Sequence, residues 1–251
     1  MRTPRHIFIT GASSGLGAAL ALEYAAAGIH LSLHGRNAAR LEQVAVRARQ
    51  KGAEALIHTG DVTDAADMET WLQSRDRNKE IDLVIANAGI SGGTAQGENA
   101  KQVASIFATN VTGVFNTVQP AVAIMTKRKR GQIAIISSLA SFRGFPGAPA
   151  YCASKAAVRV YGEGLRGEMA AHNVAVNVIC PGFVKTPMTD VNPFPMPFLM
   201  SAEHAARIIR HGLAINRARI AFPWQVYLFI RFLTSLPQPL MDFIATRTPK
   251  K

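Results

Sequence analysis

The sequence predicts an α/β fold: a doubly wound parallel sheet in a single domain with helices on both faces. Short apolar runs alternate along the chain with stretches of helical periodicity. These runs are continuous in Val, Ile and Leu, as strands buried on both faces require. The 251 residues suffice for one large domain and show no repeat or linker, so we expect one domain over residues 1–251.

The expected elements follow one another in regular alternation. Strand-like runs cover residues 6–10, 30–34, 55–59, 81–86, 132–137, 174–180 and 218–222. Helical periodicity covers residues 15–27, 38–50, 65–75, 101–126, 153–171 and 202–215. Parallel strands joined by right-handed helical crossovers form a sheet whose ligands collect at the carboxyl ends of the strands. The residues that follow each strand therefore form the candidate site.

A glycine-rich turn follows the first strand and opens the first helix. Glycines let the backbone turn tightly and approach a pyrophosphate, which then rests on the N–H groups of the helix N-terminus. A purely structural turn is the alternative, but the strand–turn–helix context favours phosphate binding. The residues expected to bind a dinucleotide here are Gly11, Ser13, Ser14, Gly15, Leu16 and Gly17.

The second strand ends without the acidic residue that usually binds an adenosine ribose 2′-hydroxyl. Gly35 occupies that place, and the next acid is Glu42. Arg36 can pair instead with a 2′-phosphate, because a guanidinium matches phosphate geometry. An ordinary surface arginine is the alternative. The combination favours NADP(H) over NAD(H) as the cofactor.

Small or polar residues also follow the third, fourth and sixth strands. Asp61 can accept a hydrogen bond from an adenine amino group, although an N-cap of the next helix would look the same. The small residues after the fourth strand permit a flat ring to lie close to the backbone. The cofactor-binding candidates at these ends are Asp61, Val62, Asn87, Ala88, Gly89, Pro181, Gly182, Val184 and Thr186.

Tyr151 and Lys155 are four residues apart, and Ser138 lies thirteen positions before the tyrosine. Residues four apart share one helix face. A neighbouring ammonium favours the phenolate, so we expect Tyr151 to exchange a proton more readily than its usual pKa of about 10 allows. For the isolated motif, a solvated surface pair is the alternative.

Six motifs together resemble the short-chain dehydrogenase/reductase family over about residues 5–215: T-G-x-x-x-G-x-G, N-A-G, Asn110, Ser138, Y-x-x-x-K and P-G-x-x-x-T. The resemblance implies the Rossmann fold and a nicotinamide cofactor. It implies that Tyr151 gives a proton to the substrate carbonyl oxygen as hydride arrives, while Ser138 holds that oxygen. Lys155 would lower the tyrosine pKa and bind the nicotinamide ribose, and Asn110 would anchor a water in the proton relay.

By the same resemblance, Val184 and Thr186 would fix the carboxamide and the phosphates of the cofactor. We therefore expect an NADPH-dependent reductase of a ketone or aldehyde on an apolar skeleton, reversible as an alcohol dehydrogenase. Two alternatives stay open, an NAD-linked alcohol dehydrogenase and a non-catalytic NADPH-sensing or scaffold protein. No metal site is expected, because Cys152 and Cys180 lack metal-ligand spacing.

The sequence departs from the family after about residue 218. Many members end in a strand and an Asp-Gly-Gly turn that helps to build tetramers, whereas here an apolar and basic extension occupies residues 223–251. We expect a homodimer through the long helices that hold Asn110 and Tyr151. Residues 187–200 match the family's substrate lid. Their Phe and Met content favours a small apolar carbonyl or alcohol substrate, with core packing as the alternative.

The formal net charge is +12. Nucleic-acid binding is not expected, since the charge is scattered and no binding motif accompanies it. The dense basic run at 127–130 is expected to be a solvated helix end. No secretory signal pattern opens the sequence, which favours a cytoplasmic protein.

Residues 217–251 carry six basic residues and one acid, so the apolar tail could contact an anionic membrane peripherally. The alternative is packing over the substrate cleft or a partner subunit.

Overall fold

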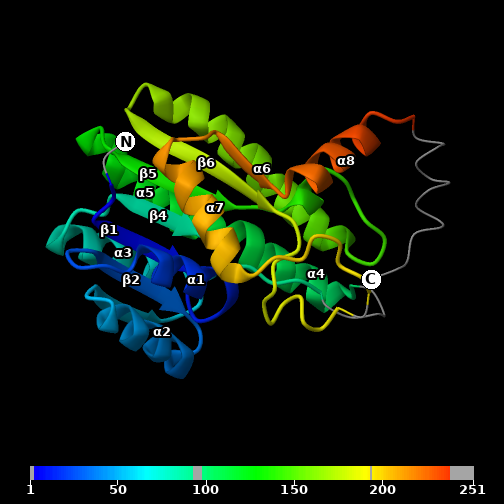
Figure 1. Ribbon diagram of the computed structural model, residues 1–251. Coiled ribbons are helices and arrows are strands. Elements are labelled where there is room, and N and C mark those ends of the chain that lie inside the picture. Colours follow the sequence, from blue (N-terminus) through cyan, green and yellow to red (C-terminus); the bar gives the residue numbers. More distant parts are fainter. Residues whose placement is uncertain (1–2, 93–97, 193, 238–251) are drawn as a thin grey trace.

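The computed structural model describes residues 3–92, 98–192 and 194–237, in which seven strands form one sheet. The strands are β1 His6–Thr10, β2 His30–Gly35, β3 Glu54–Thr59, β4 Leu83–Ala86, β5 Gly131–Ile136, β6 Val174–Pro181 and β7 Arg219–Phe222. Their order is β3-β2-β1-β4-β5-β6-β7, and every pairing is parallel (Figure 1). The predicted doubly wound parallel sheet is confirmed.

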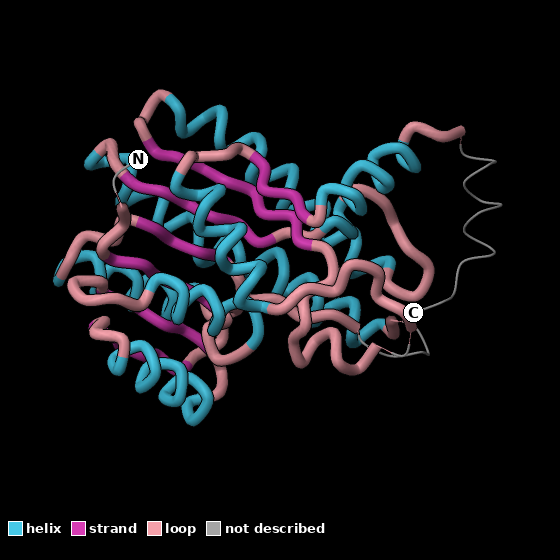
Figure 2. The backbone as a smooth tube through the Cα atoms, in the orientation of Figure 1, coloured by secondary structure: helices cyan, strands magenta, loops and turns pink. Residues whose placement is uncertain are grey.

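Helices cover both faces of the sheet (Figure 2). They are α1 Gly15–Tyr24, α2 Ala38–Gln50, α3 Ala65–Asn78, α4 Ala100–Phe107, α5 Gly113–Arg128, α6 Pro149–Ala170, α7 Ala202–Ala214 and α8 Trp224–Thr234, with a π-helical turn η1 Ala108–Thr112 and a 3₁₀ turn η2 Leu139–Ser141. The first core lies under α1, α2 and α7. The second lies under α3, α5 and α6. The winding reverses between β1 and β4, which opens a crevice at the carboxyl edge.

Two of the differences from the predicted helix bounds bear on the site. The helix expected over residues 101–126 is interrupted by η1, which carries Asn110. Helix α6 begins at Pro149 rather than at residue 153, because proline suits the first helical position and the Glu98 carboxylate accepts hydrogen bonds from the N–H groups of Ala150 and Tyr151. Tyr151 therefore lies in the first turn of α6.

The basic run at the end of α5 is only partly as expected. Lys127 and Arg128 lie in the last turn, and Lys129 ends the helix in the left-handed conformation. The prediction of a solvated end is wrong for Arg128, whose largely buried guanidinium pairs with Asp76 at 2.7 Å.

The C-terminal extension is described as far as Pro237, while residues 238–251 lie outside the described residues. Helix α8 follows β7 directly and packs through Ile230 on Leu139, Val178 and Cys180. The extension therefore lies against the carboxyl end of β6, beside the crevice.

Candidate active site

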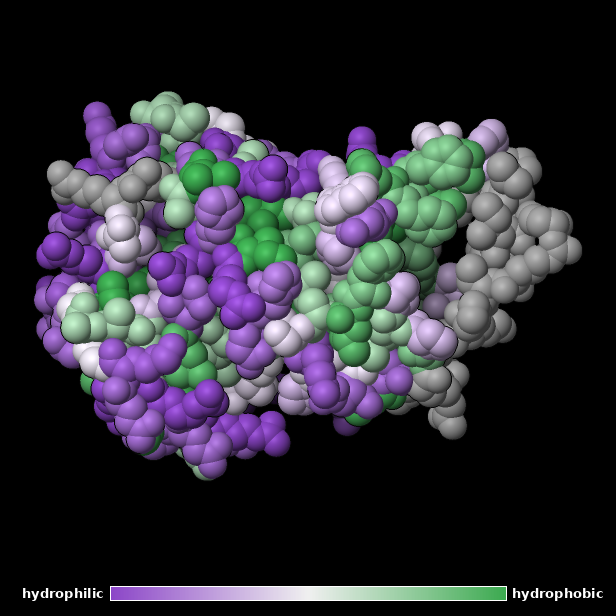
Figure 3. Space-filling model, viewed as in Figure 1, coloured by the Kyte–Doolittle hydropathy of each residue, from purple (hydrophilic) through white to green (hydrophobic). Residues whose placement is uncertain are grey.

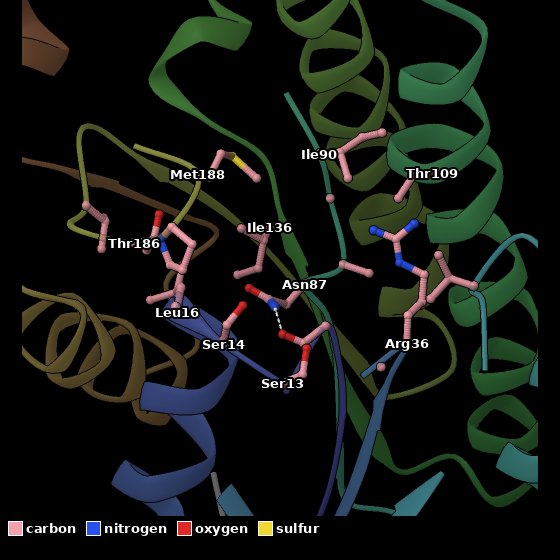
Figure 4. A pocket seen from close by; sticks show the side chains of 18 of the residues that line it. Ser13, Ser14, Leu16, Arg36, Asn87, Ile90, Thr109, Ile136, Thr186 and Met188 are labelled. Atoms are coloured by element: carbon pink, nitrogen blue, oxygen red, sulfur yellow. Dashed lines mark hydrogen bonds between the residues drawn. The ribbon is translucent and has the colours of Figure 1, made fainter. Parts of the chain in front are cut away.

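A cavity of about 550 Å³ lies at the carboxyl edge of the sheet. It receives residues from the ends of six strands and from the start of α1. Figure 4 shows Ser13, Ser14 and Asn87 between Arg36 on one side and Thr186 and Met188 on the other. The predicted residues that line it are Gly11, Ser13, Ser14, Gly15, Leu16, Arg36, Asp61, Val62, Asn87, Ala88, Gly89, Ser138, Tyr151, Lys155, Pro181, Gly182, Val184 and Thr186. Gly17 and Asn110 do not line it.

The glycine loop is shaped by close backbone approaches. Gly11 and Gly15 have positive φ angles of 65° and 53°, which residues with side chains rarely adopt. A Cβ on Gly11 would lie 2.8 Å from the Cα of Ala88. A Cβ on Gly17 would collide with the Gly11 carbonyl oxygen, so its part is to pack α1 against the loop.

The loop is also tied to β4 by hydrogen bonds. The Asn87 amide donates to the carbonyl oxygens of Thr10 (2.9 Å) and Gly11 (3.2 Å), the second drawn in Figure 4. The Thr10 hydroxyl accepts from the backbone N–H of Asn87 at 3.0 Å and of Ala88 at 3.2 Å. The Ser14 side chain makes no capping bond to α1, so the first N–H groups of that helix remain available to an anion. These features fit a dinucleotide pyrophosphate.

The far end of this cavity is basic. Arg36 lies 3.8 Å from Asp61, and its side chain is 65% exposed. Arg40, in the first turn of α2, also lines the cavity. The sequence prediction missed Arg40, although its spacing of four residues from Arg36 is a usable signal. Both guanidinium groups can approach a phosphate here.

Asp61 does not cap helix α3, because Asp64 does. One Asp61 oxygen accepts from the Thr63 N–H and hydroxyl, both at 3.0 Å. The Thr63 N–H is the main cause that holds the pKa of Asp61 below its usual value, and Arg36 adds to it. The N-cap alternative for Asp61 is therefore wrong.

His34 is a second lining residue that the sequence prediction missed. Its ring is buried, and neither nitrogen has a hydrogen-bond partner in the described part of the chain. Burial lowers its pKa to about 4, and the facing His58 ring adds to this. The ring is therefore neutral at physiological pH. In the sequence, the position of His34 at the end of β2 is the one signal that could have marked it as a lining residue.

Ser138, Tyr151 and Lys155 converge on the crevice from β5 and α6. The Tyr151 hydroxyl forms a hydrogen bond with the Ser138 side chain. The Lys155 ammonium donates to the Ile136 carbonyl at 3.0 Å and lies 6.0 Å from the centre of the Tyr151 ring. The structure thus brings together the three residues that the sequence pairs only by spacing.

Burial dominates the protonation of this group. It raises the pKa of Tyr151, and the hydrogen bond with Ser138 opposes that rise. It lowers the pKa of Lys155 to about 8. The sequence prediction that the tyrosine pKa is lowered is therefore not met in this structure, because desolvation outweighs the hydrogen bond with Ser138.

Asn110 lies in the π-helical turn and is fully buried. Its amide oxygen accepts from the Ile90 N–H at 2.8 Å, and its amide nitrogen donates to the Ile90 carbonyl (2.9 Å) and the Ser154 hydroxyl (3.0 Å). Asn110 thereby fixes the segment after β4 to the catalytic-candidate helix α6. The water-anchoring role stays a prediction.

A second, apolar cavity of about 340 Å³ adjoins the first. The two cavities share a wall made of Ser138, Tyr151, Gly182, Met188 and Thr189. The other side is formed by residues of the predicted lid and of α8, including Phe194, Phe229 and Leu233. None of the described residues that line it carries a charge.

The predicted lid, residues 187–200, is a loop whose ends are joined. Val184 and Met200 form a parallel bridge, and the Lys185 N–H donates to the Met200 carbonyl at 2.8 Å. Pro193 lies outside the described residues. The loop lines the apolar cavity through Met188, Asn192, Phe194 and Pro197, among others.

Three comparisons place these features among known proteins. A family model described as short chain dehydrogenase matches residues 5–193. An uncharacterized oxidoreductase of Myxococcus xanthus is 39% identical over 249 residues, covering 97% of this chain and 97% of the relative. A 3-oxoacyl-[acyl-carrier-protein] reductase of Synechocystis is 31% identical over 191 residues, covering 75% and 77%. The structure of a short-chain dehydrogenase from Sphingobium yanoikuyae in complex with NADPH has a TM-score of 0.81 at 26% identity, covering 98% of each chain.

Proposed function

The chain belongs to the short-chain dehydrogenase family, and we propose that it is an NADPH-dependent reductase of a ketone or aldehyde on an apolar carbon skeleton. One observation carries the proposal. Tyr151 and Ser138, joined by a hydrogen bond, form part of the wall between a polar cavity and an apolar one. A proton donor at this boundary can meet a carbonyl group whose apolar body fills the second cavity.

Bound NADPH would supply the hydride to the substrate carbonyl carbon. Ser138 would hold the carbonyl oxygen by a hydrogen bond, and Tyr151 would transfer its phenolic proton to that oxygen. The pKa of Tyr151 is raised by desolvation, which keeps the phenol protonated until substrate arrives. Lys155, largely protonated at neutral pH because its pKa is about 8, would stabilise the phenolate that remains. The phenolate recovers its proton from solvent, and the same groups can run the reverse oxidation.

The preference for NADPH over NADH rests on the basic end of the polar cavity. Arg36 and Arg40 both line it. Gly35 stands where an acidic residue would accept a hydrogen bond from a ribose 2′-hydroxyl. We assign the 2′-phosphate to these arginines and the pyrophosphate to the glycine loop.

We also propose a homodimer through the helices that carry Asn110 and Tyr151. Phe107 on α4 and Val160 on α6 are exposed, at 39% and 57%. We propose that a partner subunit covers these two side chains.

The purified protein should oxidise NADPH in the presence of apolar ketones or aldehydes, measured by nicotinamide absorbance over a carbonyl panel. Tyr151→Phe should abolish turnover while NADPH binding is retained. Tyr161→Phe is the matched control, because Tyr161 lies further along α6 and its hydroxyl accepts a hydrogen bond from the Gln119 amide. Full activity of Tyr151→Phe, or tight NADPH binding without turnover of any carbonyl, would contradict the proposal, and the second result would favour a sensor.

A further inference from the structure

Exposed apolar side chains are concentrated in the three segments that form much of the wall of the apolar cavity. Nine of the fourteen large hydrophobic residues exposed in the described part of the chain belong to these segments, which are the loop before α6, the predicted lid and α8. We call them the apolar rim: Phe145, Met188, Val191, Phe198, Leu199, Trp224, Leu228, Phe229 and Phe232. Figure 3 shows hydrophobic side chains over α8 and on the surface below it. A monomer rarely exposes so large an apolar group without a partner.

Helix α8 is apolar on two sides. Its inner side packs through Ile230, while Phe229 and Leu233 line the cavity. Trp224, Leu228 and Phe232 recur at intervals of four residues and so share another side, where they are 64%, 55% and 60% exposed. A surface helix normally carries polar residues on that side. This pattern indicates that the outer side of α8 is covered by an apolar partner.

The surroundings of the rim are basic. Two basic side chains, Arg231 of α8 and Lys185 beside the lid, are exposed, and so is the acidic side chain of Asp190 in the lid. A second copy of the chain would bring equal positive charges together across a two-fold interface. An anionic lipid surface matches both the apolar rim and the positive charge.

We propose that the apolar rim docks on the surface of an anionic lipid bilayer, with α8 lying at the headgroup boundary. No helix among the described residues is long and apolar enough to cross a membrane, and α8 spans 11 residues. The contact is therefore peripheral. Phe145, Met188 and Phe229 belong both to the rim and to the cavity wall, so the cavity opens toward the lipid. This opening lets an apolar carbonyl compound dissolved in the bilayer reach Tyr151, an inference that rests on the proposed function.

Vesicle sedimentation with the full chain tests the docking. Vesicles of phosphatidylcholine mixed with phosphatidylglycerol should bind the protein, and pure phosphatidylcholine vesicles should bind it at least about fivefold less, since each basic residue near the surface contributes attraction. The double substitution Leu228→Glu with Phe232→Glu should weaken binding more than about tenfold. Val46→Glu, at an exposed position on α2 far from the rim, should bind as the wild type does.

Fluorescence supplies a second measurement that does not depend on the double variant. In Trp71→Phe, Trp224 is the only tryptophan left, and its emission should shift to the blue with anionic vesicles. The docking proposal is overturned if the wild-type protein does not bind anionic vesicles. It is also overturned if, without vesicles, the Leu228/Phe232 variant sediments with half the mass of the wild type, because a second copy of the chain would then cover α8.

Turnover separates docking from catalysis. Leu228 and Phe232 do not line the cavity, so their double variant should reduce a water-soluble carbonyl at the wild-type rate and lose turnover of a bilayer-dissolved one. Equal turnover of both carbonyls by the variant would overturn delivery from the bilayer. Absence of all turnover in the wild type would contradict the proposed function and leave the vesicle measurement to decide the docking.

Discussion

The carboxylate of Glu98 accepts a hydrogen bond from the backbone N–H of Tyr151 at 3.1 Å, and from that of Ala150 at 2.5 Å. These N–H groups open α6 and would otherwise lack an acceptor. A charged side chain from another segment therefore fixes the first turn of the helix that carries the proposed proton donor.

Glu98→Ala should lower kcat by about tenfold, because Tyr151 loses its fixed position, and should reduce unfolding stability by about 1–2 kcal/mol. Glu98→Gln keeps one acceptor oxygen and should recover most of the activity. Steady-state kinetics and urea unfolding check both variants. Unchanged kcat in Glu98→Ala would show that the backbone of Tyr151 needs no such cap.

Gly17→Ala should destabilise the protein by about 2 kcal/mol or more and abolish NADPH binding, since the new methyl group collides with the Gly11 carbonyl oxygen and the Asn87 amide. Gly167→Ala in α6 is the matched control, because no atom lies within 4 Å of the added Cβ. That control should be neutral or more stable by about 0.5–1 kcal/mol. Thermal unfolding and fluorescence titration with NADPH distinguish them, and equal behaviour of the two variants would refute the packing argument.

Local pattern predicted the sheet, the glycine loop and the positions of Ser138, Tyr151 and Lys155. Period and spacing suffice there, because most strands are apolar runs, the glycine loop and Ser138 follow strands closely, and Tyr151 and Lys155 are four residues apart on one helix. The start of α6 could not be predicted in this way, since its cap comes from Glu98, far away in the sequence. The π-helical turn at Asn110 depends on contacts with Ile90 and Ser154, which no local pattern encodes.

The apolar cavity required the structure for the same reason. Met188 and Phe229 come from separate segments, and only the fold brings them to one cavity. The pKa of Tyr151 also depended on burial, because spacing gave the neighbouring cation but not the loss of solvent around the phenol.

Arg36→Ala and Arg40→Ala should each raise the KM for NADPH by about tenfold, because each removes a charged partner of the 2′-phosphate. The KM for NADH should change less than about twofold. Arg47→Ala, at an exposed position further along α2, serves as control and should leave both constants unchanged. Equal losses with both cofactors would show that these arginines do not recognise the 2′-phosphate.

Lys155 should make the cofactor-free protein more stable as the pH rises above 8. Its pKa falls from 10.5 to about 8 on folding, so between these values the unfolded chain binds the proton and the folded chain does not. Stability must then increase with pH, by about 1 kcal/mol between pH 8 and 9, and the gain should be missing in Lys155→Met. Burial raises the pKa of Cys180 to about 11, which works in the opposite direction above pH 9. The difference between wild type and Lys155→Met in urea unfolding cancels that contribution, and identical pH slopes for the two proteins would show that Lys155 keeps its ordinary pKa.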